Sequence, residues 1–174
     1  MTTNRLTVLI CTHNRSDLLA KVLDSLNRAT RPEGWEVGIL AVPTACTDDT
    51  HTLLEAYRDQ ADTQARLPLR WEAEPTPGKS HALNRGAMEL KDGWVAIVDD
   101  DHRVAEDFLV EIARAVAAHP EATMLCGRIL PDWDGSEPAW VHDPGPYRIY
   151  PLPIPRQEFG ETSRELGLDG LIPG

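Results

Sequence analysis

Short apolar runs alternate with stretches of helical periodicity along most of the chain. Each run is typical of a buried β-strand, and the expected strands cover residues 6–11, 36–42, 69–72, 95–98 and 123–129. Apolar positions at helical spacing lie between them, and the expected helices begin at or just after Ser16, Thr47 or Asp48, Ser80 and Glu106. The alternation predicts an α/β fold with an open, mostly parallel sheet and helices on both faces.

Polar segments follow the first four expected strands. They read CTHNR, PTACTDD, PTPGKSH and DDDH, and they begin at residues 11, 43, 75 and 99. In open parallel sheets, ligands bind outside the carboxyl ends of the strands. We therefore expect these segments to meet at one edge of the sheet and to form the functional site there.

The segment DDDH places three consecutive carboxylates, Asp99, Asp100 and Asp101, at the end of an apolar run. Many acidic clusters are solvated loops, or lie near a helix N-terminus where the helix dipole favours negative charge. Here the run reads as a buried central strand, and three adjacent like charges repel one another unless a cation is held between them. A hard divalent cation with oxygen ligands is the commonest such partner. The segment therefore predicts a metal site.

Charge and cysteine content limit the partners and the compartment. The chain has 174 residues and a formal net charge of −11, which suits one domain and disfavours nucleic acids and anionic membranes as partners. Its cysteines, Cys11, Cys46 and Cys126, are widely spaced and odd in number, which favours free thiols in a reducing compartment. The sequence shows neither a signal peptide nor an apolar run of membrane-spanning length. We expect a cytoplasmic protein without a transmembrane segment; peripheral binding at the inner membrane face is the alternative location.

Four segments resemble, in the right order, motifs of the inverting family-2 glycosyltransferases of the GT-A fold. The similar stretches are VLICTHNRSDLLAKVLDSL, TACTDDT, PGKSHALNRGA and VAIVDDDHRVAEDFL, and the resemblance covers roughly residues 5–142. Each motif is weak alone, whereas four in order are specific. The resemblance implies a Rossmann-like nucleotide-diphospho-sugar transferase fold and the transfer of a sugar from a nucleoside diphosphate donor.

The resemblance also implies roles for individual residues. The turn of Cys11, Thr12 and His13 would hold the nucleotide, with Arg15 either close to the diphosphate or supporting the loop. Lys79 would approach the nucleotide side of the pocket. Asp99 and Asp100 would face the ribose and the metal. Asp101, together with Asp99, would bind Mn²⁺ or Mg²⁺ that bridges the two phosphates. Such an ion neutralises the charge that develops on the departing nucleoside diphosphate.

Two departures from the family pattern leave parts of the function open. Pro43 occupies the position of an Asp that commonly recognises the base, so the choice of nucleotide and sugar is open. We expect the catalytic base, usually an Asp or Glu of the C-terminal half in this family, to lie beyond Gly174. Residues 1–130 would form the nucleotide-sugar-binding domain, and the Pro- and Gly-rich segment 131–174 would start the acceptor-binding part. The acceptor, whether a saccharide, a lipid or a protein, is also open.

Two other functions compete with glycosyl transfer. A phosphohydrolase with paired aspartates would normally place them after the first strand, where this chain has CTHN. A nucleotide-binding or interaction module that kept the fold without turnover is compatible with Pro43 and with a missing base. If the rest of the acceptor-binding part lies beyond Gly174, we also expect an exposed apolar surface where it would pack. Such a surface favours self-association.

Overall fold

The computed structural model describes residues 4–61, 63–90, 92–130, 132 and 135–136. These residues belong to two compact units, one ending at Pro120 and the other starting at Glu121. The first unit contains all the helices and strands of the described part of the chain. Most of the segment expected to begin an acceptor-binding part, residues 131–174, lies outside the described residues.

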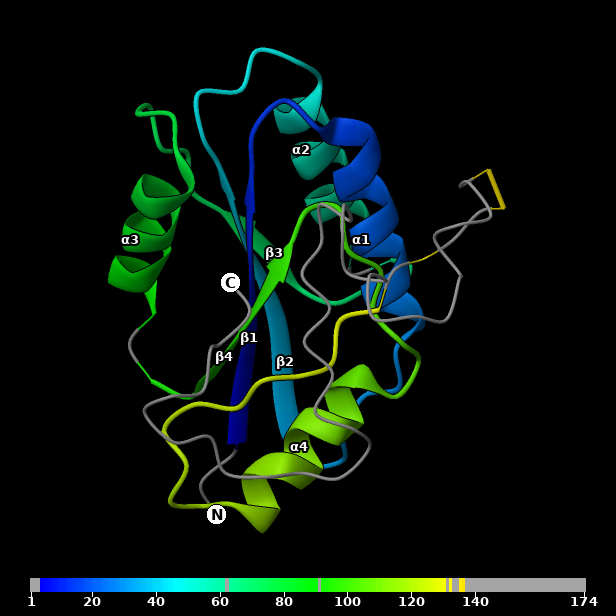
Figure 1. Ribbon diagram of the computed structural model, residues 1–174. Coiled ribbons are helices and arrows are strands. Elements are labelled where there is room, and N and C mark those ends of the chain that lie inside the picture. Colours follow the sequence, from blue (N-terminus) through cyan, green and yellow to red (C-terminus); the bar gives the residue numbers. More distant parts are fainter. Residues whose placement is uncertain (1–3, 62, 91, 131, 133–134, 137–174) are drawn as a thin grey trace. The chain divides into compact units, whose positions relative to one another are not determined.

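The first unit is built on a four-stranded parallel sheet in the order β3-β2-β1-β4 (Figure 1). The strands are β1 (Asn4–Thr12), β2 (Trp35–Pro43), β3 (Leu69–Trp71) and β4 (Trp94–Asp99). The register aligns Thr12 with Pro43 and Cys11 with Asp99. The carboxyl ends of β1, β2 and β4 therefore lie together at one edge of the sheet.

Helices cover both faces of this sheet, which confirms the predicted open α/β fold. They are α1 (Ser16–Arg28), α2 (Thr50–Ala61), α3 (Lys79–Glu89) and α4 (Phe108–Ala118). Side chains of α1, α2 and α4 join the core cluster on one face, whereas α3 packs against β1 and β2 on the other. None of the helices in the described residues is both long enough and apolar enough to span a membrane.

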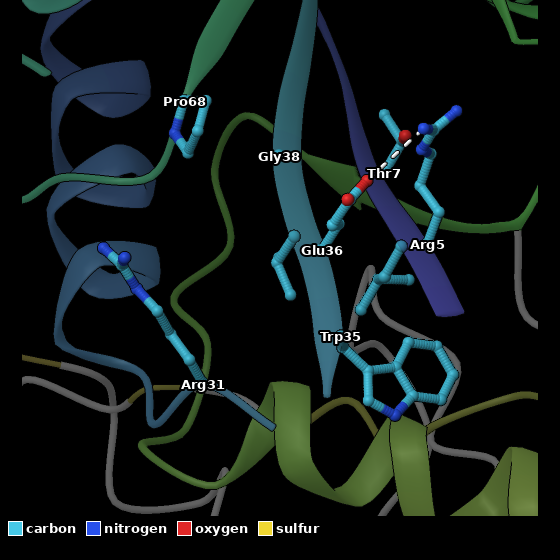
Figure 2. A pocket seen from close by; sticks show the side chains of 9 residues that line it. Arg5, Thr7, Arg31, Trp35, Glu36, Gly38 and Pro68 are labelled. Carbon is cyan, nitrogen blue, oxygen red and sulfur yellow. Dashed lines mark hydrogen bonds and ion pairs between the residues drawn. The ribbon is translucent and has the colours of Figure 1, made fainter. Parts of the chain in front are cut away.

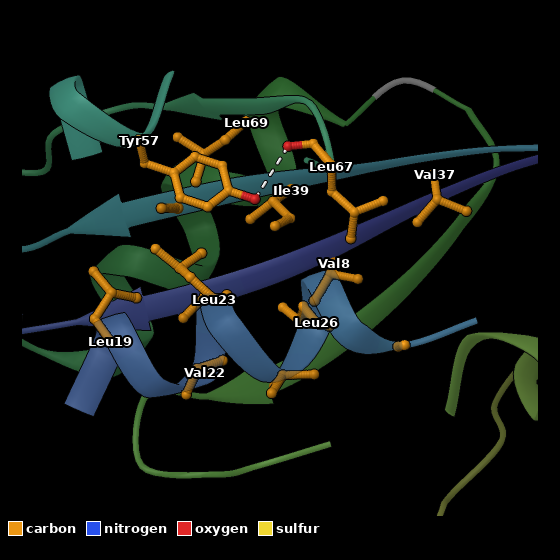
Figure 3. Close-up of a cluster of buried hydrophobic side chains, with 14 of the residues drawn as sticks. Val8, Leu19, Val22, Leu23, Leu26, Val37, Ile39, Tyr57, Leu67 and Leu69 are labelled. Carbon is orange, nitrogen blue, oxygen red and sulfur yellow. Dashed lines mark hydrogen bonds between the residues drawn. The ribbon is translucent and has the colours of Figure 1, made fainter. Parts of the chain in front are cut away.

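Successive side chains of β1 point to opposite faces of the sheet, so this one strand contributes to both hydrophobic clusters. In β1, Leu6, Val8 and Ile10 point into the larger cluster, while Leu9 points toward α3. Figure 3 shows the larger cluster, in which the Tyr57 ring lies among aliphatic side chains. Its buried hydroxyl bonds to the amide oxygen of Asn27 at 2.9 Å and lies 3.2 Å from the carbonyl oxygen of Leu67. The polar tip of this core residue is therefore satisfied, as burial requires.

Most predicted elements begin and end within two residues of the observed ones, and the fifth strand is the exception. Residues 124–130 are irregular, so the strand predicted over 123–129 is wrong. The sequence is rich in strand-forming residues, but a strand also requires a hydrogen-bonded neighbour, and none of the described residues pairs with this segment. Its larger side chains are correspondingly exposed, with Met124 at 61% and Ile129 at 57%.

The edge strand β4 is uncovered on the face that α3 shares. Val95 and Ile97 lie there at 42% and 58% exposure, and Ile97 is in register with the buried Leu9 of β1. The helix α3 packs on β1 and β2, so the apolar stripe continues past the helix onto β4. An exposed apolar surface is thus present on the first unit.

An open pocket lies at the opposite end of the sheet, between the amino ends of β1 and β2 (Figure 2). Its charged side chains already have partners. Arg5 pairs with Asp92 at 2.8 Å and with Glu36 at 3.3 Å, and Arg31 donates to the backbone oxygen of Ala65. This pocket lies far along the strands from the acidic segment and uses none of the predicted site residues.

Candidate functional site

The four polar segments meet at the carboxyl edge of the sheet, as their positions after the strands predict. The loop after β1 contacts the loop after β2, where His13 Nδ1 lies 2.6 Å from the backbone oxygen of Thr44. The segment before α3 reaches β4 through Lys79, whose Nζ lies 2.8 Å from Asp99 Oδ1. Arg15 connects the first loop to the acidic segment by contacts with Asp100 and Asp101.

Asn14 and Asp48 fasten the first two loops to each other. The side-chain oxygen of Asn14 accepts hydrogen bonds from the backbone N–H of Thr47 at 2.7 Å and of Asp48 at 3.3 Å. In return, Asp48 Oδ2 accepts the backbone N–H of Ser16, the first residue of α1, at 3.0 Å. The N-terminal turn of α1 is thus capped by Asp48 from another loop.

The same contacts tune the Asp48 carboxyl and the conformation of Asn14. Desolvation of Asp48 opposes ionisation, but hydrogen bonds from Thr50 and Ser16 outweigh it and hold the pKa of Asp48 below its ordinary value. Asn14 has φ of +52°, in the left-handed region that asparagine tolerates better than most residues. Both features indicate that the two loops form one ordered unit.

Removing the Asn14 acceptor should destabilise the protein. We expect Asn14→Gly to lower the free energy of unfolding by about 1 kcal/mol, because two backbone N–H groups lose their partner. Asn14→Ala should cost about 1 kcal/mol more, since alanine also strains the left-handed backbone. Urea unfolding of both variants measures these differences. A wild-type midpoint for Asn14→Gly would contradict a stabilising role for the side chain.

The acidic segment is held by two cations. Asp100 is buried, at 6% exposure, and Arg15 Nη1 lies 3.1 Å from its Oδ1. The same Arg15 nitrogen lies 3.3 Å from Asp101 Oδ2. With Lys79 on Asp99, two positive side chains pair with three carboxylates in this group of described residues, which leaves the group with a net negative charge. The residual charge favours an additional cation at this edge.

Asp99, Asp101 and His102 form the group that could hold a metal ion among the described residues. One ligand atom from each lies within 4.8 Å of the others. Two carboxylate oxygens and an imidazole nitrogen are a donor set that Mn²⁺ and other divalent ions accept, so the residues present fit a divalent metal. The sequence pattern pointed to the aspartates but gave His102 no role. Its signal was only that it directly follows them.

The nucleotide-side residues of the prediction lie at the end of β1. Thr12 is 2% exposed, and its backbone oxygen accepts from the Thr44 N–H at 2.9 Å and the Thr44 hydroxyl at 3.0 Å. Within the described residues, the Thr12 hydroxyl oxygen has no hydrogen-bond partner. Burial raises the pKa of the Cys11 thiol to about 11; the positive charge of Lys79 opposes this rise, and the carboxylates of Asp99 and Asp100 add to it. Cys11 is therefore a neutral thiol near pH 7 and is unsuited to nucleophilic catalysis.

Comparison with known proteins defines the class. Residues 7–169 match the glycosyl transferase family 2, and the match extends over most of the sequence. The chain therefore belongs to glycosyl transferase family 2. A comparison with curated proteins gave no match.

Solved structures of similar fold include a mannosyltransferase. The mannosyltransferase PcManGT from Pyrobaculum calidifontis, in complex with GDP-Man and Mn²⁺, has 27% identity and a TM-score of 0.57, covering 71% of this chain and 35% of that chain. TarS from S. aureus has 23% identity and a TM-score of 0.56, covering 73% and 23%. TarS 1-349 in complex with UDP-GlcNAc has 24% identity and a TM-score of 0.53, covering 74% and 37%. The chain thus spans well under half the length of these proteins.

Proposed function

We propose that this chain binds a nucleoside diphosphate sugar and a divalent metal as part of a glycosyltransferase that transfers the sugar to an acceptor. The observation that supports this most strongly is the group of Asp99, Asp101 and His102 beside two cationic side chains at the carboxyl edge of the sheet. A structurally similar mannosyltransferase of 27% identity was solved with GDP-Man and Mn²⁺, which supports a donor and a metal of this kind.

In this proposal the aspartates bind the metal and the cations bind the diphosphate. Asp101 and Asp99 would hold Mn²⁺ or Mg²⁺, which, when bound, would neutralise charge on the departing nucleoside diphosphate. Arg15 and Lys79 are both about half exposed and pair with these carboxylates. Once a bound metal neutralises the carboxylates, the side chains of Arg15 and Lys79 are available to turn toward phosphate oxygens, which are good partners for Arg and Lys. Asp100 stays buried against Arg15 and orients it.

The nucleotide would lie against Cys11, Thr12 and His13 at the end of β1. His13, whose exposed ring is held at the backbone oxygen of Thr44, is the polar side chain offered there. Recognition of the base edge is weak near Pro43, because proline has no side-chain donor and its carbonyl already accepts the Glu74 N–H at 3.0 Å. A site without a dedicated polar partner discriminates poorly between bases.

Thermal unfolding of the full chain tests the proposal. UDP, GDP and dTDP are each added with and without Mn²⁺, and we expect the melting temperature to rise with ligand concentration and to rise further with the metal. Because of Pro43, the affinities for the three nucleotides should lie within about a hundredfold of one another. The absence of a shift with every nucleotide and metal combination would overturn the proposed function.

The same preparation separates an enzyme from a binding module. Donor hydrolysis or transfer to an added acceptor, followed beside the thermal shifts, reports turnover. Binding without turnover under all conditions would favour the non-catalytic nucleotide-binding alternative, with which Pro43 is compatible.

A further inference from the structure

We propose that His102 is a third protein ligand of the divalent metal, so that the site combines two carboxylates with an imidazole and prefers Mn²⁺ over Mg²⁺. The inference rests on the proposed function, because it assigns a ligand and an ion preference to the same site. It adds a residue to which the motif Asp99 to Asp101 assigns no role. Three observations support it: the local turn, the ligand-atom spacing and the partners already held by the two aspartates.

A tight turn brings His102 back to the end of β4. The backbone N–H of His102 donates to the backbone oxygen of Asp99 at 3.2 Å, which closes a four-residue turn. The chain beyond it is fixed to α1, because the N–H of Val104 donates to the Ser25 hydroxyl at 3.2 Å. His102, three residues after Asp99, is thereby returned to the same edge as Asp99.

The spacing of the ligand atoms suits an ion between them. His102 Nε2 lies 4.0 Å from Asp101 Oδ1, which is too far for a hydrogen bond. Two donors that share an ion at bond lengths of about 2.1 Å lie roughly 3 Å apart when adjacent and roughly 4.2 Å apart when opposite. The observed 4.0 Å falls within this range. Within the described part of the chain, the His102 ring makes no hydrogen bond that would compete.

The contacts of the aspartates leave this gap open. Arg15 approaches Asp101 at Oδ2, so the oxygen that faces His102 is the other one. Lys79 pairs with a single oxygen of Asp99. The His102 side chain is 33% exposed, which lets an ion reach the ring while the ring stays anchored by the turn. An ion can therefore bind without first breaking the contact between Arg15 and Asp101.

The chemistry of the imidazole ligand predicts which metal ion the site prefers. Mg²⁺ prefers oxygen ligands and loses its water reluctantly, whereas imidazole nitrogen binds first-row transition ions well. A nitrogen ligand should therefore add to the affinity for Mn²⁺ and Co²⁺ and add little for Mg²⁺. Replacing His102 should lower the affinity for Mn²⁺ while leaving that for Mg²⁺ almost unchanged.

The test uses Mn²⁺ as the probe on the full chain. Electron paramagnetic resonance titration gives the Mn²⁺ affinity, and electron spin echo modulation reports a nitrogen bound to the ion. His102→Asn should lower the Mn²⁺ affinity about tenfold and abolish the nitrogen signal, with Mg²⁺ affinity, measured by competition, within about twofold of wild type. His81→Asn makes the same chemical change at an exposed position of α3 and should alter neither quantity.

Each outcome decides one of the two proposals. A nitrogen signal that survives in His102→Asn, or that is absent from Mn²⁺-loaded wild-type protein, would overturn the role of His102 while leaving the carboxylate site intact. An equal loss of Mn²⁺ and Mg²⁺ affinity would also overturn it, since that pattern indicates a general disturbance of the turn. A wild-type protein that binds no Mn²⁺, with or without UDP or GDP, would refute the metal site itself and with it the proposed function.

Discussion

Asp101→Asn is expected to remove the metal-dependent part of nucleotide binding. The amide keeps the shape of the side chain but removes the negative charge that attracts a divalent ion, so the UDP or GDP affinity measured with Mn²⁺ should fall by about 100-fold or more. The affinity measured without metal should change little, because Lys79 and the loop after β1 are untouched. Titration calorimetry with and without Mn²⁺ measures both quantities.

The fold should survive this substitution. The Asp101 side chain is 50% exposed, and its contact with Arg15 at 3.3 Å is a partly solvated ion pair of small net stability. Asp24→Asn is the matched control, since it makes the same change in an exposed pair with Arg28 on α1. If Asp101→Asn and Asp24→Asn bind nucleotide equally well with Mn²⁺, Asp101 is not a metal ligand.

The fold could be predicted from the sequence because each helix and strand is encoded by a pattern within a short stretch of residues. Apolar residues predominate in β1 and β2, and those of α1 recur at helical spacing, so both patterns can be recognised from the sequence alone. Parallel pairing followed from the alternation of strand and helix. The strand expected over 123–129 failed because a strand depends on a neighbour, which composition does not reveal.

The site could be predicted in location and only partly in its contacts. Segments that follow parallel strands meet at one edge, so the aspartates, Arg15 and Lys79 could be placed together in advance. Which cation pairs with which carboxylate depends on contacts between distant residues, such as Arg15 with Asp100. The exchange between Asn14 and Asp48 is likewise a contact between two loops. His102 was missed because its position depends on a turn that a single histidine does not signal.

Gly93→Ala is expected to destabilise the protein by about 3 kcal/mol, the largest loss of stability among the glycine positions of the first unit. Gly93 lies just before β4 with φ of +91°, a conformation that L side chains rarely adopt. A Cβ atom there would lie 2.7 Å from the backbone oxygen of Arg5 and 3.0 Å from its Cβ. Backbone strain and a collision with backbone therefore act together. Urea unfolding measures the loss.

Gly34→Ala separates these two causes. Gly34 has φ of +75°, but a Cβ atom there would meet nothing within 4 Å, so the variant carries strain without collision and should cost about 1 kcal/mol. The difference between the two variants reports the contact of Gly93 with Arg5, which precedes the first residue of β1 paired with β4. In Gly86→Ala the nearest atom is instead the flexible end of the Leu9 side chain, at 2.7 Å, which can move aside in part. Gly93→Ala should therefore unfold at the lowest urea concentration of the three variants. Equal midpoints for Gly93→Ala and Gly34→Ala would show that the Arg5 backbone moves away from the added Cβ atom at little energetic cost.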